Sequence, residues 1–134
     1  MFTLSKNEYD IVSLLWKEGR ALSRTEIINL STEKQWKPSS IHILLNSLLN
    51  KGAIHVEGFT QTKKNFGRTY AAAVTPEEYA AMQFTKSIPQ ERENKDNLPK
   101  MFSALINMDD VNQDTLSELQ KILDQKKEEL QEWA

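Results

Sequence analysis

Apolar side chains recur every three or four positions through the first fifty residues, which is the spacing of one face of an α-helix. The sequence SKNE at 5–8 is a capping box, in which the serine and glutamate side chains each satisfy a backbone N–H of the other residue. It predicts a helix that contains Ile11, Leu14 and Leu15 and ends near Gly19.

Two further helices follow with the same spacing. A second capping box, SRTE at 23–26, predicts a helix that ends around Lys34. Pro38 suits the first turn of a third helix, which runs to about Lys51 and is closed by Gly52. The predicted core consists of the apolar positions of these helices, with two tryptophans packed around them: Ile11, Leu14, Leu15, Ile27, Ile28, Ile41, Leu44, Leu45, Leu48 and Leu49, with Trp16 and Trp36.

The pattern then changes to that of β-strands. The segments 53–60 (AIHVEGFT) and 68–74 (RTYAAAV) are rich in β-forming residues, and a polar, basic segment lies between them. This arrangement predicts a β-hairpin with a basic tip. Three helices followed by a hairpin is the order of a winged helix-turn-helix, which we assign to residues 1–75 as a DNA-binding domain.

Helical spacing returns after the hairpin. TPEEY at 75–79 begins a helix that reaches about residue 88, and the charged segment 89–97 is expected to be a linker or a frayed turn. Two more helices are expected, one from about Leu98 and one capped by Asp114. Their apolar residues have little chain left to cover them, so we assign residues 76–134 to a helical dimerisation region. The residues that we expect at the dimer interface are Leu98, Met101, Phe102, Leu105, Ile106, Leu116, Leu119, Ile122, Leu123 and Leu130. The predicted fold class is mainly α with a small β-hairpin.

Charge divides the chain at the same place. The formal net charge is −2. Residues 1–75 carry 10 Lys and Arg against 6 Asp and Glu, or +4, whereas residues 76–134 carry 7 against 13, or −6. The basic half could bind a polyanion while the acidic half has a different function, although chance could produce the same division.

Composition argues against an enzyme, a metal or a cofactor. The chain has no cysteine, so disulfides, thiol nucleophiles and thiolate metal sites are excluded. Its two histidines are His42 and His55, and His55 with Glu57 would supply two ligands where catalytic zinc needs three. The sequence has no signal peptide and no apolar run of the roughly 18–20 residues that span a bilayer, so we expect a cytoplasmic protein without a membrane partner.

The third helix carries the candidate DNA-reading residues. The face opposite its leucines presents Ser39, Ile43, Asn46, Ser47 and Asn50, with Ser40 and His42 at the edges. Small polar side chains allow close approach in the major groove, asparagine can pair with adenine, and Ile43 would lie where it can contact a thymine methyl group. The alternative is a solvated helix face with one exposed isoleucine.

Phosphate contacts are expected from residues around this helix. The candidates are Arg24 and Thr25 at the start of the second helix, Lys37 before the third, and Lys63, Lys64 and Arg68 at the hairpin tip. The clustering at the tip is a more specific signal than any single lysine.

Several motifs resemble the penicillinase-repressor (BlaI/MecI/CopY) family of bacterial transcriptional repressors. One is E-x-x-I-x-x-x-LW, formed by Glu8, Ile11, Leu15 and Trp16. Others are the segment from Trp36 to Ile54 with its LLN and KGAI sequences, GRTY at 67–70 and VTPEEY at 74–79. The resemblance covers most of the chain and is densest over residues 5–79.

The resemblance implies a homodimer whose winged helices bind the half-sites of a palindromic operator and whose acidic C-terminal helices hold the dimer together. It places base reading on Ser39, Ser40, His42, Ile43, Asn46 and Ser47, and wing contacts on Lys63, Lys64 and Arg68. An inactivating protease or a sensor system is a further candidate partner. Family members usually have threonine where Ile43 stands, and the Asn–Phe bond cleaved in β-lactam-responsive members is missing from 103–107.

The predicted function is therefore a sequence-specific transcriptional repressor without a cofactor. The alternative is a winged-helix adaptor that binds a protein through the same face. The third helix favours this alternative in one respect, because it has no Lys or Arg between Pro38 and Asn50.

Overall fold

The computed structural model describes residues 1–61, 66–88 and 94–133. The chain divides into two compact units, Met1–Ser87 and Ile88–Ala134. This division lies later in the chain than the functional boundary expected between residues 75 and 76, which stays a prediction.

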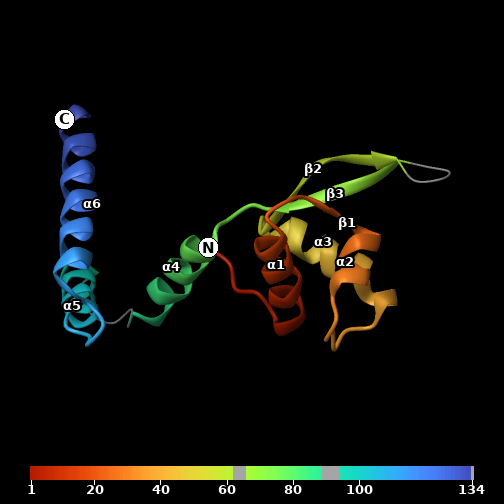
Figure 1. Cartoon of the computed structure of the whole chain (residues 1–134), viewed down its shortest axis with the longest axis horizontal. Helices are drawn as coiled ribbons and strands as arrows, with labels where there is room; N and C mark the ends of the chain where they lie inside the picture. Colours follow the sequence, from red (N-terminus) through yellow and green to blue (C-terminus); the bar gives the residue numbers. More distant parts are fainter. Residues whose placement is uncertain (62–65, 89–93, 134) are drawn as a thin grey trace. The chain divides into compact units, whose positions relative to one another are not determined.

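Helices α1 (Lys6–Glu18), α2 (Arg24–Leu30) and α3 (Ile41–Lys51) build the helical part of the first unit (Figure 1). Both predicted capping boxes are present, at Ser5 with Glu8 and at Ser23 with Glu26. The helical spacing and the caps therefore predicted where α1 and α2 begin.

The end of α2 was predicted wrongly. The helix ends at Leu30 rather than around Lys34. Ser31 leaves the helical conformation, with ψ of 90°, and its hydroxyl donates to the Ile27 carbonyl at 2.6 Å. A serine that bonds back to the preceding turn competes with continuation of the helix.

The helix that begins at Pro38 has two parts, a 3₁₀ turn η1 (Pro38–Ser40) and then α3. Gly52 closes α3 as predicted, in the left-handed conformation with φ of 79°. Glycine has no Cβ to oppose that conformation, which lets the chain turn directly into the sheet.

The sheet is antiparallel, with strands β1 (Leu22–Ser23), β3 (Phe66–Ala72) and β2 (Ile54–Gln61) in that order. The predicted hairpin is β2 with β3, and Ile54 lies opposite Ala72. The ladder is irregular between Val56 and Gly58, as a β-bulge would make it. Strand β1 was not predicted, because a segment of two residues has no recognisable period.

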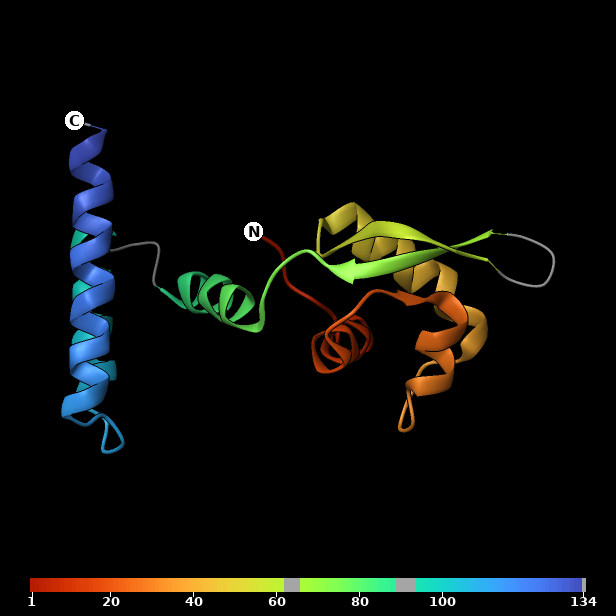
Figure 2. The same ribbon diagram turned by 45° about the horizontal axis from the view of Figure 1, so that its top comes forward.

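The core of the first unit lies between the three helices and the sheet, as Figure 2 shows from a second direction. The predicted core residues are buried in it or packed against it. The structure adds six buried side chains that were not predicted: Leu4, Val12, Leu22, Ala53, Ile54 and Tyr70.

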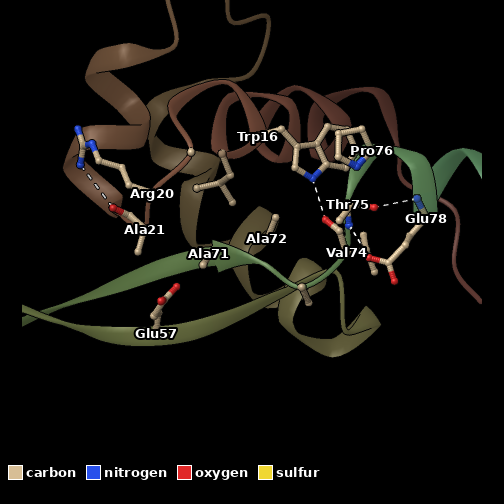
Figure 3. Close-up of a pocket in the computed structure, with 13 residues that line it drawn as sticks. Trp16, Arg20, Ala21, Glu57, Ala71, Ala72, Val74, Thr75, Pro76 and Glu78 are labelled. Carbon is tan, nitrogen blue, oxygen red and sulfur yellow. Dashed lines mark hydrogen bonds between the residues drawn. The ribbon is translucent and has the colours of Figure 1, made fainter.

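Helix α4 (Pro76–Ser87) follows β3 through a junction at residues 73–75. The Trp16 indole N–H donates to the Val74 carbonyl at 2.8 Å, and Thr75 and Glu78 cap the helix reciprocally (Figure 3). A shallow groove of about 530 Å³ lies beside this junction, lined in part by Arg20 and Glu57.

The second unit contains α5 (Asn94–Ile106) and α6 (Gln113–Glu132). Two expectations were wrong here. Helix α5 begins within the segment expected to be a linker, and Asn112 rather than Asp114 caps α6, by accepting from the Thr115 N–H at 3.0 Å. None of the described helices combines the length and the apolar character needed to cross a bilayer.

Candidate nucleic-acid interface

Helix α3 is anchored on one side and open on the other. Ile41, Leu45 and Leu48 are buried in the core, whereas Ile43 on the opposite side has 73% of its surface exposed. The side chains that share this outer face are Ser39, His42, Asn46 and Asn50, which are all exposed, and Ser40, which is half-buried. The core contacts therefore turn most of the predicted base-reading residues outward.

Ser47 differs from these residues. It is half-buried, and its hydroxyl donates to the Glu8 carboxylate of α1 at 2.6 Å. The same carboxylate binds the Lys51 ammonium group at 2.5 Å. Ser47 therefore joins the outer face of α3 to α1 and presents no free hydroxyl proton to a DNA base.

Glu8 stays ionised although it is almost fully buried. Burial by itself raises the pKa of a carboxyl group, but hydrogen bonds from Lys51, Ser47 and Ser5 outweigh it and lower the pKa of Glu8 to about 2. The Glu8 carboxylate therefore both caps α1 and holds α3. The capping motif in the sequence predicts only the first of these functions.

Two predicted contact residues meet at the edge of this face. The Arg24 Nη1 and His42 Nε2 atoms lie 2.5 Å apart, and both side chains are exposed. A guanidinium group can only donate, so a hydrogen bond between these atoms uses His42 Nε2 as the acceptor. Thr25 and Lys37, the other predicted contacts in this region, are also exposed.

Arg24 belongs to the first turn of α2, where the capping box already uses the nearby backbone groups. The pKa of Glu26 is lowered by the hydrogen bond from the Ser23 backbone and by Arg20, whose guanidinium lies 2.9 Å away. The positive charge next to α3 therefore comes from exposed side chains such as Arg24 and Lys37. It does not come from the backbone N–H groups at the N-terminal end of α2.

The hairpin contributes Arg68, which is exposed on β3 opposite Phe59 of β2. Lys63 and Lys64, the other predicted wing contacts, lie outside the described residues. Phe59 has 67% of its surface exposed, and sequence reasoning missed it as a candidate. The sequence feature that could have identified Phe59 is a large apolar residue close to the basic tip of the predicted hairpin.

The outer faces of the second unit carry the residues predicted for dimerisation. Most of them are exposed, namely Leu98, Leu105, Leu116, Ile122, Leu123 and Leu130, while Met101, Phe102, Ile106 and Leu119 are half-buried. Within the described residues, no group of three or more histidine, aspartate or glutamate side chains is arranged to hold a metal ion.

Comparison with known proteins identifies the family. The sequence model of the penicillinase repressor family matches residues 4–125. A relative from Latilactobacillus sakei, described as an uncharacterized 16.5 kDa protein in the ptsI 3' region, is 27% identical over 122 residues, which cover 90% of this chain and 77% of that protein.

Two solved structures are similar at low identity. One is Bacillus subtilis PadR in complex with operator DNA, with a TM-score of 0.46 and 21% identity over 93% of this chain and 72% of that one. The other is NMB1585, a MarR family regulator from Neisseria meningitidis, with a TM-score of 0.41 and 15% identity over 92% and 81% of the two chains. Because the family model spans nearly the whole sequence, the chain belongs to the penicillinase repressor family, whose members are DNA-binding transcriptional regulators and not enzymes.

Proposed function

We propose that this protein is a cytoplasmic repressor that binds a palindromic operator as a homodimer. The observation that carries the proposal is the outer face of α3, where small polar side chains and Ile43 surround Asn46 on a helix held rigidly by its core side. Such a face can enter the major groove, and Asn46 can pair with an adenine edge.

The second unit supports the homodimer. The apolar residues of α6 and its C-cap follow one another at intervals of three, four or seven residues, the spacing of a coiled-coil seam: Leu116, Leu119, Leu123, Leu130 and the C-cap Trp133. Several of these side chains are exposed, and Trp133 has 90% of its surface open to solvent. A second copy of the chain could cover them and would bring two α3 helices to one two-fold symmetric site.

DNA selection with the purified protein tests the proposal. Random duplexes retained by the protein should be enriched in a two-fold symmetric site. The same selection with Asn46→Ala should retain the symmetry but lose preference at one base pair in each half-site. Enrichment without symmetry would contradict the homodimer, and absence of any enriched sequence would contradict base reading.

One observation favours a second candidate, a winged-helix adaptor that binds a protein. The exposed face of α3 has no Lys or Arg between Pro38 and Asn50, and Arg24 is engaged with His42. Titration with nonspecific duplex at low salt discriminates the two. A repressor should bind and then be released as salt rises, because phosphate contacts displace counterions, whereas an adaptor should bind little at any salt concentration.

A further inference from the structure

Ser47 lies at the border of the outer face of α3. Its neighbours on the helix surface are Ile43, four residues before it, and Asn50, three residues after it, and both are exposed. Ser47 itself is half-buried, so the protein covers part of its side chain and the rest is open on the outer face. A base pair that approaches Ile43 would therefore also approach the Ser47 hydroxyl.

Glu8 fixes the direction of the Ser47 hydroxyl proton. Ser47 Oγ donates to Glu8 Oε2 at 2.6 Å. The pKa of Glu8 is lowered to about 2, so this almost fully buried side chain is an ionised carboxylate, and a carboxylate can only accept hydrogen bonds. The serine must therefore supply the proton of this hydrogen bond.

Other contacts hold the carboxylate in place. Glu8 Oε1 accepts from Lys51 Nζ at 2.5 Å and from the Ser5 backbone N–H at 2.7 Å. Ser5 is the N-cap of α1 and Lys51 belongs to the last turn of α3, so both helices orient the carboxylate. If the Ser47 hydroxyl turned away, a buried charge would lose one of its hydrogen-bond partners, which is unfavourable.

A hydroxyl whose proton is already used keeps only its acceptor lone pairs. A free serine can donate to a base or accept from one, so it discriminates weakly between bases. We infer that Ser47 acts as an acceptor and reads the exocyclic amino group of an adenine or a cytosine in the major groove, and that Glu8 is the positioning residue that imposes this direction. The inference rests on the proposed function, because it requires α3 to lie in the major groove.

The base pair that Ser47 contacts can be found by DNA selection with Ser47→Ala and a matched control. The control is Ser13→Ala, which removes the hydroxyl of another half-buried serine, in α1. The contacted base pair is the one at which Ser47→Ala loses preference and Ser13→Ala does not. In a duplex of the selected sequence, adenine at that pair is replaced by purine, or cytosine by 2-pyrimidinone. Each replacement removes only the amino group that Ser47 would read.

Affinities for the natural duplex and the amino-free duplex give the result. The intact protein and Ser13→Ala should lose about three- to tenfold in affinity when the amino group is removed, which is the effect of one hydrogen bond. Ser47→Ala should bind the two duplexes within about twofold of each other, because it has no acceptor to lose. Base pairing is weaker in the amino-free duplex, but this affects every protein equally and cancels in the comparison.

Glu8→Gln tests the positioning role. Because Lys51 and the Ser5 N–H both donate at Oε1, the amide oxygen should occupy that place and the amide NH₂ group should face Ser47. The hydrogen bond is then reversed, and the Ser47 proton is free to bind a base carbonyl. Removal of the base amino group should therefore cost this variant about twofold or less in affinity. The ratio of two affinities is measured on one folded protein, so a lower stability of the variant leaves it unchanged.

Three results would overturn the inference. The first is a selection in which Ser47→Ala loses preference at no base pair, since Ser47 would then have only a structural role. The second is an equal effect of amino removal on Ser47→Ala and the intact protein. The third is unchanged discrimination in Glu8→Gln, which would remove the positioning role of Glu8. If selection with the intact protein enriched no sequence, the proposed function itself would fail, and that result is visible before any variant is made.

Discussion

The two units of the chain treat their apolar side chains in opposite ways. The first unit buries a continuous cluster in which Ile11, Ile27 and Leu48 are fully inaccessible. In the second unit, residues 94–133 as described contain no buried apolar side chain, and Leu130 and Trp133 are 61% and 90% exposed. A fully buried aliphatic side chain contributes about 1.5–3 kcal/mol, so the first unit has a source of stability that residues 94–133 do not match.

This difference supports the proposed division of DNA binding and dimerisation between the two units. A self-sufficient core can hold α3 rigidly, and rigidity is what presents Asn46 and Ile43 in a constant geometry. Exposed apolar stripes on α5 and α6 are instead typical of a surface that awaits a partner. Within the first unit, residues 2–5 contact both α4 and α3, because the Leu4 N–H donates to the Tyr79 hydroxyl and the Lys51 ammonium donates to the Thr3 carbonyl.

Removal of the second unit tests the contrast most severely. A truncated chain of residues 1–88 should be a folded monomer, because the buried cluster is complete without the remainder. Its affinity for a two-half-site operator should fall by roughly 10²–10⁴, since the second contact is no longer intramolecular. Sedimentation and DNA titration measure both effects. Binding of the full operator with undiminished affinity would contradict the proposed dimer, as would a full-length chain that sediments as a monomer at micromolar concentration.

Matched leucine substitutions should show that the two units are stabilised in different ways. Leu48→Ala should lower the free energy of unfolding by about 2–5 kcal/mol at every protein concentration, because it leaves a cavity in a closed core. Leu130→Ala should act only through association, so its effect should disappear on dilution. Chemical denaturation at several protein concentrations measures the difference, and a concentration-independent loss for Leu130→Ala would show that α6 is stabilised within one chain.

Acid should weaken the first unit through Glu8. The pKa of Glu8 is lowered from 4.5 to about 2, so its carboxylate stabilises the folded unit above pH 4.5 and this stability is lost as the pH falls towards 2. The difference corresponds to about 3 kcal/mol at 1.36 kcal/mol per pKa unit.

Glu8→Gln should therefore be less stable at neutral pH and less sensitive to acid between pH 4.5 and 2. Glu77→Gln is the control, because Glu77 is exposed at the start of α4. The unfolding temperature of each variant, measured as a function of pH, tests this prediction. Equal acid sensitivity of the Glu8 variant and the intact protein would mean that other carboxylates carry the effect.

The smallest effects concern DNA contacts within the first unit. Asn46→Ala should weaken binding to the preferred site by about 1–3 kcal/mol and relax sequence preference. Arg68→Ala should weaken binding to all DNA sequences about equally and reduce the slope of log K against log salt by about 1. Lys121→Ala, an exposed lysine of α6, should change neither quantity. A reduced salt slope for Lys121→Ala would place DNA contacts in the second unit as well.

Some of the differences between prediction and structure occurred where several local signals compete. Asn112 and Asp114 can both cap a helix, and the structure uses Asn112. The helical pattern through Ile27 and Leu30 did not reveal that Ser31 would turn back onto its own helix. In each case the end of the helix depends on a local side-chain hydrogen bond, which periodicity cannot resolve.

The sequence by itself determined the helices and the hairpin of the first unit, apart from the end of α2, and the outward face of α3. Capping boxes, glycine caps and apolar spacing act between residues a few positions apart, so they are legible in the chain before it folds. These signals also predicted that Ile43 and Asn46 would be turned away from the core, since the apolar residues of a helix define its buried side.

Only the tertiary structure decided how that face is held. Strand β1 exists because Leu22 meets Tyr70, and Glu8 binds Ser47 and Lys51 across 39 and 43 positions of sequence. The Leu4 N–H likewise donates to the Tyr79 hydroxyl, 75 positions away. Such partners are brought together by burial of the core, and the free energy of a polar contact depends on the geometry and burial that the fold creates. No local pattern contains that geometry, so these contacts could be found only in the folded molecule.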